Sequence, residues 1–230
     1  MKSRIPTEVR NVRRDLTNYA FHFVNREPSP QATLSKILAD GLVEGKIYPP
    51  SAVPAVCLTD APLAEVVRQN GVLDTLDYRR LSLWGIGFEK TMLFELGARP
   101  VIYQPRRELS LLDPSISWRH VDYDPTNRVD FSWQREWRVP TSGLSFTSAD
   151  VVLVVPEVDV FLRDLWEVFV DVDVSDGETQ LYAQTVKKWD FIPLDHVDIS
   201  DDASIEVCRS DDWRDIILED YYERMDYQGP

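Results

Sequence analysis

Short runs of β-branched and aromatic residues alternate with short amphipathic segments through much of the chain. The first run, YAFHFV at residues 19–24, predicts a strand. The segment after it predicts a helix, because Ser29 suits an N-cap, Pro30 suits the first turn and Gly41 suits the stop. The apolar residues of that helix fall on one face: Leu34, Ile37 and Leu38.

The same alternation continues in the middle of the chain. Residues 55–59 predict a strand that turns at Asp60 into a helix. Residues 83–105 predict a strand, a helix that stops at Gly97, and a second strand. The two glycines of the strand near residues 84–88 indicate close approach of another group, most often by packing. Residues 106–128 predict a loop or short helices.

The run DFSWQREWRVP, residues 130–140, predicts a strand with charged residues inside it. Successive side chains of a strand point to opposite faces, so Glu136 and Arg138 share one face. Arg135 is then expected on the other face, together with Trp137 and Val139. A carboxylate beside a guanidinium is either an ion pair or an acid positioned for chemistry.

The last third predicts a strand in ADVVLVVPE, a helix near residues 158–165, further strands and helices over 166–194, and a terminal helix at 213–225. The simplest organisation is one α+β domain of mixed strands and helices. We expect a basic arm at residues 1–18, the domain at 19–195, and an acidic, helical C-terminal segment at 196–230 packed on it.

Composition indicates a folded protein that stays in the cytoplasm. The chain has 230 residues, 43% of them hydrophobic, with seven tryptophans, which is enough for a core. No stretch approaches the roughly 20 apolar residues of a membrane span, and the start lacks the apolar segment of a secretory signal. The two cysteines, Cys57 and Cys208, are more typical of free thiols than of a disulfide.

The net charge of −14 is unevenly distributed. Residues 1–14 carry five basic residues and one acidic residue, whereas residues 195–230 carry twelve acidic and three basic residues. An acidic body opposes broad binding to nucleic acid, which depends on phosphate neutralisation by Lys and Arg. Contact with nucleic acid is therefore expected to be local, with the basic arm as its candidate, although a solvated arm explains the same composition.

Common catalytic motifs are absent from the sequence. It has no G-x-S-x-G elbow, P-loop, G-x-G-x-x-G or H-E-x-x-H, and no recognisable set of metal ligands. Polar residues remain on or beside three short strands: His22, Thr59 with Asp60, and Glu136. Each has a structural alternative, namely a hydrogen-bonded histidine, a helix N-cap and an ion pair with Arg138.

The order of the motifs carries a family resemblance. The segments HFV, TLSKILADGL, VCLTDAPL, WGIGFEKTMLFELGARPVIYQP and FSWQREWRV, over roughly residues 19–160, resemble the AbiGi family of phage abortive-infection proteins. A strand with His, the helix L-x-x-I-L-x-x-G-L, a strand with a hydroxyl residue and a late Glu are similar in order to DarT-type ADP-ribosyltransferases. The resemblance implies an ADP-ribosyltransferase-like core.

The second resemblance implies NAD as substrate and Glu136 as the catalytic carboxylate. Transfer of ADP-ribose breaks the bond between nicotinamide and ribose through a transition state with oxocarbenium character, as in glycoside cleavage. A carboxylate stabilises that charge or deprotonates the acceptor. The acceptor is expected to be a nucleic acid or a protein.

The same resemblance implies roles for five further residues in binding NAD. His22 is expected to hydrogen-bond the ribose or amide, Thr59 to fix the nicotinamide ribose, and Tyr103 to stack on the nicotinamide ring. A planar guanidinium suits the pyrophosphate, with two candidates, Arg138 and Arg99.

A non-catalytic role is the alternative. AbiGi-like proteins are often labelled antitoxins, so the chain is also expected as the partner of a cognate toxin or antitoxin. The mixture of aromatic and acidic residues in the C-terminal segment suits a protein interface. A metal-dependent nuclease is a third alternative.

Overall fold

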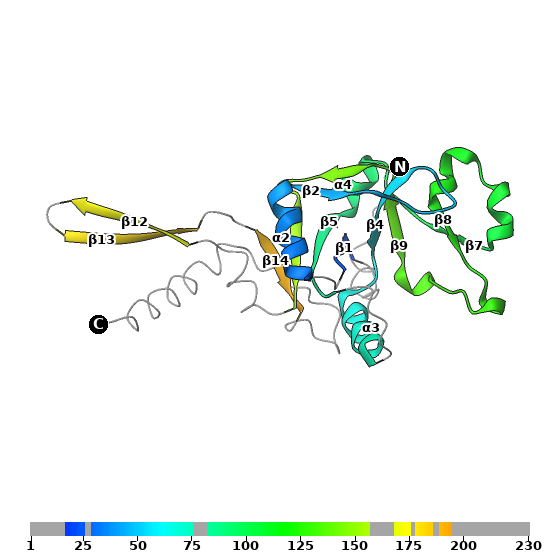
Figure 1. Cartoon of the computed structure of the whole chain (residues 1–230), viewed down its shortest axis with the longest axis horizontal. Coiled ribbons are helices and arrows are strands. Elements are labelled where there is room, and N and C mark those ends of the chain that lie inside the picture. The colour runs from blue at the N-terminus through cyan, green and yellow to red at the C-terminus, as the bar shows by residue number, and fades with distance from the viewer. Residues whose placement is uncertain are drawn as a thin grey trace, which may run out of the picture.

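The computed structural model describes residues 17–25, 29–75, 82–156, 168–175, 178–185 and 189–194 (Figure 1). At residues 72–75, 168–175 and 178–185 only the backbone is described. Residues 1–16 of the predicted basic arm, the helix near 158–165 and the acidic C-terminal helix lie outside the described residues. Within them the chain forms a mixed α+β fold around an eight-stranded sheet.

The central sheet places strands from distant parts of the chain side by side. Its order is β14-β11-β5-β1-β4-β9-β6, with β3 paired to β4 beside this path. Neighbouring strands run antiparallel except β11 and β14, which are parallel. The bounds are β1 Tyr19–Phe23, β3 Lys46–Ile47, β4 Pro54–Thr59, β5 Gly85–Glu89, β6 Arg99–Pro100, β9 Glu136–Val139, β11 Val151–Val155 and β14 Asp190–Pro193.

Three pairs of shorter or separate strands complete the described sheets. They are β2 (Leu42–Glu44) with β10 (Gly143–Ser145), β7 (Ile102–Gln104) with β8 (His120–Asp122), and β12 (Val168–Ser175) with β13 (Glu178–Thr185). The β12–β13 hairpin extends away from the central sheet (Figure 1). Its two strands belong to the segment that joins β11 to β14.

The helices are short. They are α2 (Pro30–Asp40), α3 (Leu63–Thr75) and α4 (Lys90–Glu95), with the 3₁₀ helices η1 (Arg106–Leu111), η2 (Pro114–Arg119), η3 (Pro125–Asn127) and η4 (Ser132–Gln134). The predicted ends of α2 are confirmed. The Ser29 side chain accepts a hydrogen bond from the N–H of Ala32, and Gly41 ends the helix with a φ of 60°.

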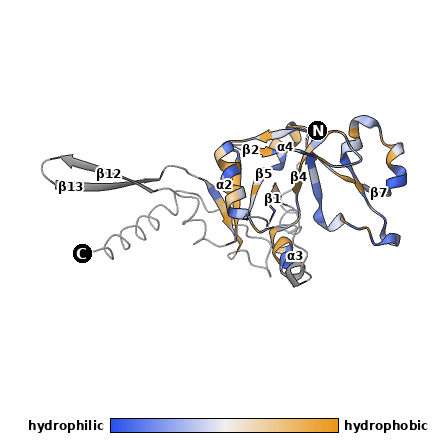
Figure 2. Ribbon diagram, viewed as in Figure 1, coloured by the Kyte–Doolittle hydropathy of each residue, from blue (hydrophilic) through white to orange (hydrophobic). Residues whose placement is uncertain are grey.

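The sheet is buried on both faces. Along β11, Leu153 packs with α2 and α4 on one face, and Val154 packs with α3 on the other. This burial explains the continuous apolar runs of the central strands, because both faces must exclude water. Figure 2 shows the apolar residues along β4 and β5 in the middle of the sheet.

The two glycines of β5 are explained by packing, as the sequence indicated. A Cβ on Gly85 would lie 2.8 Å from the ring of Phe23, and one on Gly87 would lie 2.8 Å from the ring of Phe21. The aromatic rings of β1 therefore lie against the bare backbone of β5. This arrangement fixes β1, whose second half borders the candidate site.

The structure corrects the expected strand at residues 130–140. Residues 132–134 form η4, and Arg135 adopts a φ of 45°, so the strand begins only at Glu136. Arg135 therefore does not continue the strand alternation with Trp137. The shared face of Glu136 and Arg138 is confirmed, because both lie within β9 and their side chains pair.

The segment after Gly97 also differs from the single strand expected there. It divides at Val101, so that β6 pairs with β9 and β7 pairs with β8. Residues 106–128 contain the expected short helices, together with β8. In the parts of the chain that the structure describes, no helix is both long enough and apolar enough to cross a membrane.

Candidate functional site

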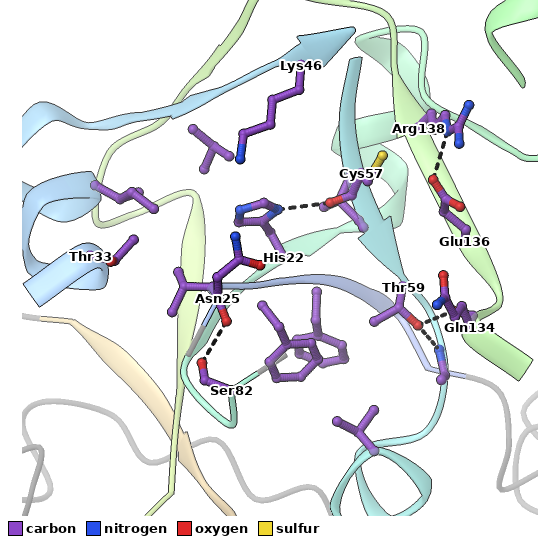
Figure 3. Close-up of a pocket in the computed structure, with 18 of the residues that line it drawn as sticks. His22, Asn25, Thr33, Lys46, Cys57, Thr59, Ser82, Gln134, Glu136 and Arg138 are labelled. Carbon is purple, nitrogen blue, oxygen red and sulfur yellow. Dashed lines mark hydrogen bonds and ion pairs between the residues drawn. The ribbon is translucent and has the colours of Figure 1, made fainter. Parts of the chain in front are cut away.

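A cavity of about 630 Å³ opens where β1 and β4 separate. Within the described residues the two strands share one register pair, Phe21 with Thr59. Beyond that pair, the second half of β1 and residues 57–59 of β4 line the cavity from opposite sides (Figure 3). Helices α2 and α3, the segment 42–48 and the loop before β9 contribute the rest of the lining.

His22 projects from β1 into this cavity. Its Nδ1 lies 2.9 Å from the carbonyl oxygen of Cys57, and because a carbonyl only accepts, Nδ1–H is the donor. The His22 side chain is thus hydrogen-bonded to a main-chain carbonyl oxygen of β4. Burial lowers the pKa of His22, the hydrogen bond opposes this shift, and the nearby charge of Lys46 adds to it. The neutral ring then presents an unprotonated Nε2, which has no hydrogen-bond partner among the described residues.

Thr59 ends β4 and fixes the start of the next loop. Its hydroxyl donates to the carbonyl oxygen of Gln134 and accepts from the N–H of Ala61, 3.0 Å away. Both bonds are to main-chain groups, so the hydroxyl joins the end of β4 to the turn before β9. Thr59 lies opposite Glu136 in the register and lines the same cavity.

Glu136 and Arg138 form a largely buried ion pair on the cavity wall. The Nε of Arg138 donates to Oε1 of Glu136 at 2.7 Å. Its Nη1 donates to the carbonyl oxygens of Trp118 at 2.7 Å and His120 at 3.2 Å. Burial is the largest influence on the pKa of Arg138 and lowers it, but the charge and hydrogen bond of Glu136, together with Cys57, outweigh it, so the pKa is raised overall. Arg138 is only 7% exposed. Its bonds to the two carbonyl oxygens fix the guanidinium, which in turn positions the carboxylate of Glu136.

Cys57 and Tyr48 close the space around that ion pair. Cys57 lies opposite Arg138 in the register, and the guanidinium carbon of Arg138 lies 5.1 Å from the centre of the Tyr48 ring. Burial, and after it the Glu136 carboxylate, raises the pKa of the Cys57 thiol to about 12. Burial likewise raises the pKa of Tyr48. A thiol with such a high pKa is a poor nucleophile, so Cys57 serves as cavity wall.

The backbone before Glu136 is held by a buried charge cluster. Asp60 accepts from Nε of Arg135 at 2.9 Å and from Nζ of Lys90 at 2.8 Å. The N–H of Asp60 also donates to the carbonyl oxygen of Arg135. Asp60 is 8% exposed, so these interactions fix the left-handed conformation of Arg135 and the direction in which Glu136 leaves the loop. This cluster could not be predicted from local sequence patterns, because its members are distant in the chain.

Two expected site residues lie outside the lining of the cavity. The hydroxyl of Tyr103 accepts from the N–H of Glu136 at 3.0 Å, so this residue supports the main chain of β9. Arg99 donates to the carbonyl oxygens of Phe94 and Ala98, and its guanidinium lies 3.6 Å from the centre of the Phe94 ring. His22, Thr59, Glu136 and Arg138 do line the cavity.

Among the residues that the structure describes, three cationic side chains line the cavity, and two of them have carboxylate partners. Arg138 pairs with Glu136, and Lys36 pairs with Asp40 at 2.6 Å. Lys46, on β3, has no ion pair among the described residues. Figure 3 shows its ammonium group on the same side of the cavity as His22. Sequence reasoning missed Lys46, because a lone lysine in a two-residue strand has no distinctive pattern.

The cavity suits an organic ligand with a few polar groups. Its volume falls within the range of typical small-molecule sites, and apolar side chains such as Phe23 and Val66 alternate with polar ones. Among the described residues, no group of three or more His, Cys, Asp or Glu side chains is placed to hold a metal ion. The site therefore offers a histidine acceptor, a carboxylate and a lysine around a partly apolar space.

Comparisons of the chain with models of known protein families, with curated proteins and with solved structures give no match.

Proposed function

We propose that this protein is an NAD-dependent ADP-ribosyltransferase-like protein of a bacterial phage-defence or toxin–antitoxin system. The observation that supports this best is the meeting of His22, Thr59 and Glu136 around one cavity. They come from three neighbouring strands, β1, β4 and β9, although they are far apart in the sequence. The order of motifs predicted these three residues as one site.

In this proposal Glu136 acts on the ribose of NAD. The bond between nicotinamide and the ribose carbon breaks, the electron pair leaves with nicotinamide, and the ribose gains oxocarbenium character. A carboxylate beside the ring stabilises that positive charge and takes the proton of the acceptor hydroxyl or amine, whose oxygen or nitrogen forms the new bond to the ribose carbon. Arg138 holds one oxygen of Glu136 at 2.7 Å, which restricts the rotation of the carboxylate.

The residues at the cavity fit NAD in part. The volume is adequate for much of a dinucleotide, and Nε2 of neutral His22 can accept from a ribose hydroxyl or a carboxamide N–H. The two arginines expected for the pyrophosphate are engaged with main-chain oxygens instead. A positive group other than Arg138 and Arg99 is therefore needed at the cavity.

Calorimetric titration with NAD tests the proposal. We expect saturable binding by the wild-type protein and weaker binding by His22→Ala, because the acceptor at Nε2 is lost. Arg99→Ala is the matched control, since Arg99 lies outside the lining, and its affinity should equal that of the wild type. Absence of binding at millimolar NAD would contradict the proposal.

The second proposal is a non-catalytic antitoxin or interaction protein. It is favoured by the ion pair of Glu136 with Arg138, because a paired carboxylate has an architectural role without any ligand. The acidic segment 196–230 would then carry the partner interface. Deletion of residues 200–230 should abolish capture of the cognate toxin in a pull-down, and unchanged capture would refute this second proposal.

A further inference from the structure

The cation without a carboxylate partner marks one end of the cavity. Lys36 is 73% exposed and its ammonium group is 2.6 Å from Asp40, so much of its charge is offset. Arg138 is buried against Glu136 and two carbonyl oxygens. Lys46 is exposed and lines the same cavity, but it differs from both because no described carboxylate pairs with it.

Other polar groups face the same end of the cavity. His22 comes from β1, Lys46 from β3 and Asn25 from the residues after β1, and Figure 3 shows the three side chains close together. The charge of Lys46 reaches His22, whose pKa it helps to lower. The Nδ1–H of His22 donates to the carbonyl oxygen of Cys57, so Nε2 of the same ring can accept a hydrogen bond from a ligand. The ammonium group of Lys46 and the side-chain amide of Asn25 can donate to such a ligand.

A phosphate ester next to a ribose matches this pattern of donors and acceptors. Phosphate oxygens accept from an ammonium group and an amide, and a ribose hydroxyl donates to an unprotonated imidazole nitrogen. Lysine binds phosphate as a compact charge and needs no planar geometry. Water can solvate the exposed ammonium group of Lys46 when no anion is bound, and a phosphate would add a direct counter-charge that a neutral ligand lacks.

We propose that Lys46, with Asn25 and His22, forms an anion subsite that holds a phosphate of the ligand in this cavity. The inference rests on the proposed function for the identity of the ligand, since NAD would bring its pyrophosphate there. It assigns to Lys46 the role that sequence reasoning gave to Arg138 or Arg99.

Calorimetry with three probes tests the subsite: ADP-ribose, inorganic pyrophosphate and adenosine, which lacks phosphate. Lys46→Ala should weaken binding of ADP-ribose by about tenfold, the usual effect of one charge-assisted contact. Lys46→Arg should recover most of it. The matched control is Lys36→Ala, which removes a cation of the same cavity that already has a carboxylate partner, and it should change affinity less than twofold.

Salt and phosphate dependence complete the test. Binding of ADP-ribose should weaken with added salt in the wild type and less so in Lys46→Ala, because screening acts on the charge that was removed. Any affinity for adenosine should be equal in the two proteins. Equal losses in Lys46→Ala and Lys36→Ala would overturn the subsite, since they would indicate a general effect of charge.

The outcomes separate this inference from the proposed function. Lys46-dependent binding of pyrophosphate, with no binding of ADP-ribose or NAD, would support the anion subsite and contradict the NAD proposal. Binding of ADP-ribose that Lys46→Ala leaves unchanged would overturn the subsite and leave the NAD proposal standing. If neither pyrophosphate nor ADP-ribose binds the wild type, the subsite is refuted.

Discussion

Replacement of Arg138 by methionine is expected to destabilise the protein strongly. Methionine approximates the length of the arginine stem but removes all its hydrogen bonds. Glu136 would lose a 2.7 Å partner, and the carbonyl oxygens of Trp118 and His120 would lose their bonds to Nη1. The side chains of Arg138 and Glu136 are 9% and 12% exposed, so water can replace little of what is lost.

The size of the effect follows from this burial. Removing one member of a buried ion pair typically costs about 3–5 kcal/mol, because the other charge remains without a partner. An unsatisfied buried carbonyl adds about 1–3 kcal/mol, although relaxation of the 3₁₀ segment before β8 would reduce this. Because that relaxation offsets the carbonyl contribution, we count the ion pair alone and expect Arg138→Met to lower the free energy of unfolding by about 3–5 kcal/mol.

Urea unfolding of the full chain, with linear extrapolation to water, measures this change. Arg99→Met is the matched control, because Arg99 lies directly opposite Arg138 on β6 but is partly exposed. Arg99→Met should lower the free energy of unfolding by about 1 kcal/mol or less, because it removes hydrogen bonds at a partly exposed site and the contact with the Phe94 ring. Equal effects of the two substitutions would refute the assignment of Arg138 as the buried support of Glu136.

Three further predictions concern the cavity. Because the pKa of His22 is lowered in the folded state, the unfolded state binds more protons, so stability should fall as pH drops below about 6.5. In His22→Gln this loss between pH 7 and pH 5.5 should be smaller, and an identical pH profile of unfolding would contradict the shift. Alkylation of Cys57 at pH 8, followed by mass spectrometry, should be at least roughly tenfold slower in folded than in unfolded protein, given a thiol pKa of about 12. Thr59→Val should lower the free energy of unfolding by about 1–2 kcal/mol, because two main-chain groups lose the hydroxyl, whereas Thr59→Ser should be nearly neutral by urea titration.

The elements predicted from local sequence signals are mostly confirmed. Ser29 and Gly41 determine the ends of α2 through chemistry that acts over a few residues, and the apolar runs of β1, β4, β5 and β11 predicted strands. Local signals also predicted that Glu136 and Arg138 share a face, because both lie within one strand. Such features depend on neighbours in the sequence.

The features that sequence reasoning missed depend on distant parts of the chain. Arg135 adopts a left-handed conformation that Asp60 supports from 75 residues away, so the strand expected at 130–140 begins late. Tyr103 was expected to stack on a ligand, yet its hydroxyl supports the main chain of Glu136. The charge of Lys46 matters because the sheet places it by the cavity, and no local pattern marks that position.

The release of nicotinamide from NAD is the most direct test of the central claim that Glu136 is a catalytic carboxylate. We would compare wild type with Glu136→Gln, with nucleic acid and cell lysate as acceptors. The glutamine oxygen can still accept from Nε of Arg138, so a urea titration should show that the fold is retained. We expect release by the wild type that falls at least roughly a hundredfold in Glu136→Gln, in line with the loss of a general base. Release that is equal in both folded proteins, or absent from the wild type, would contradict it.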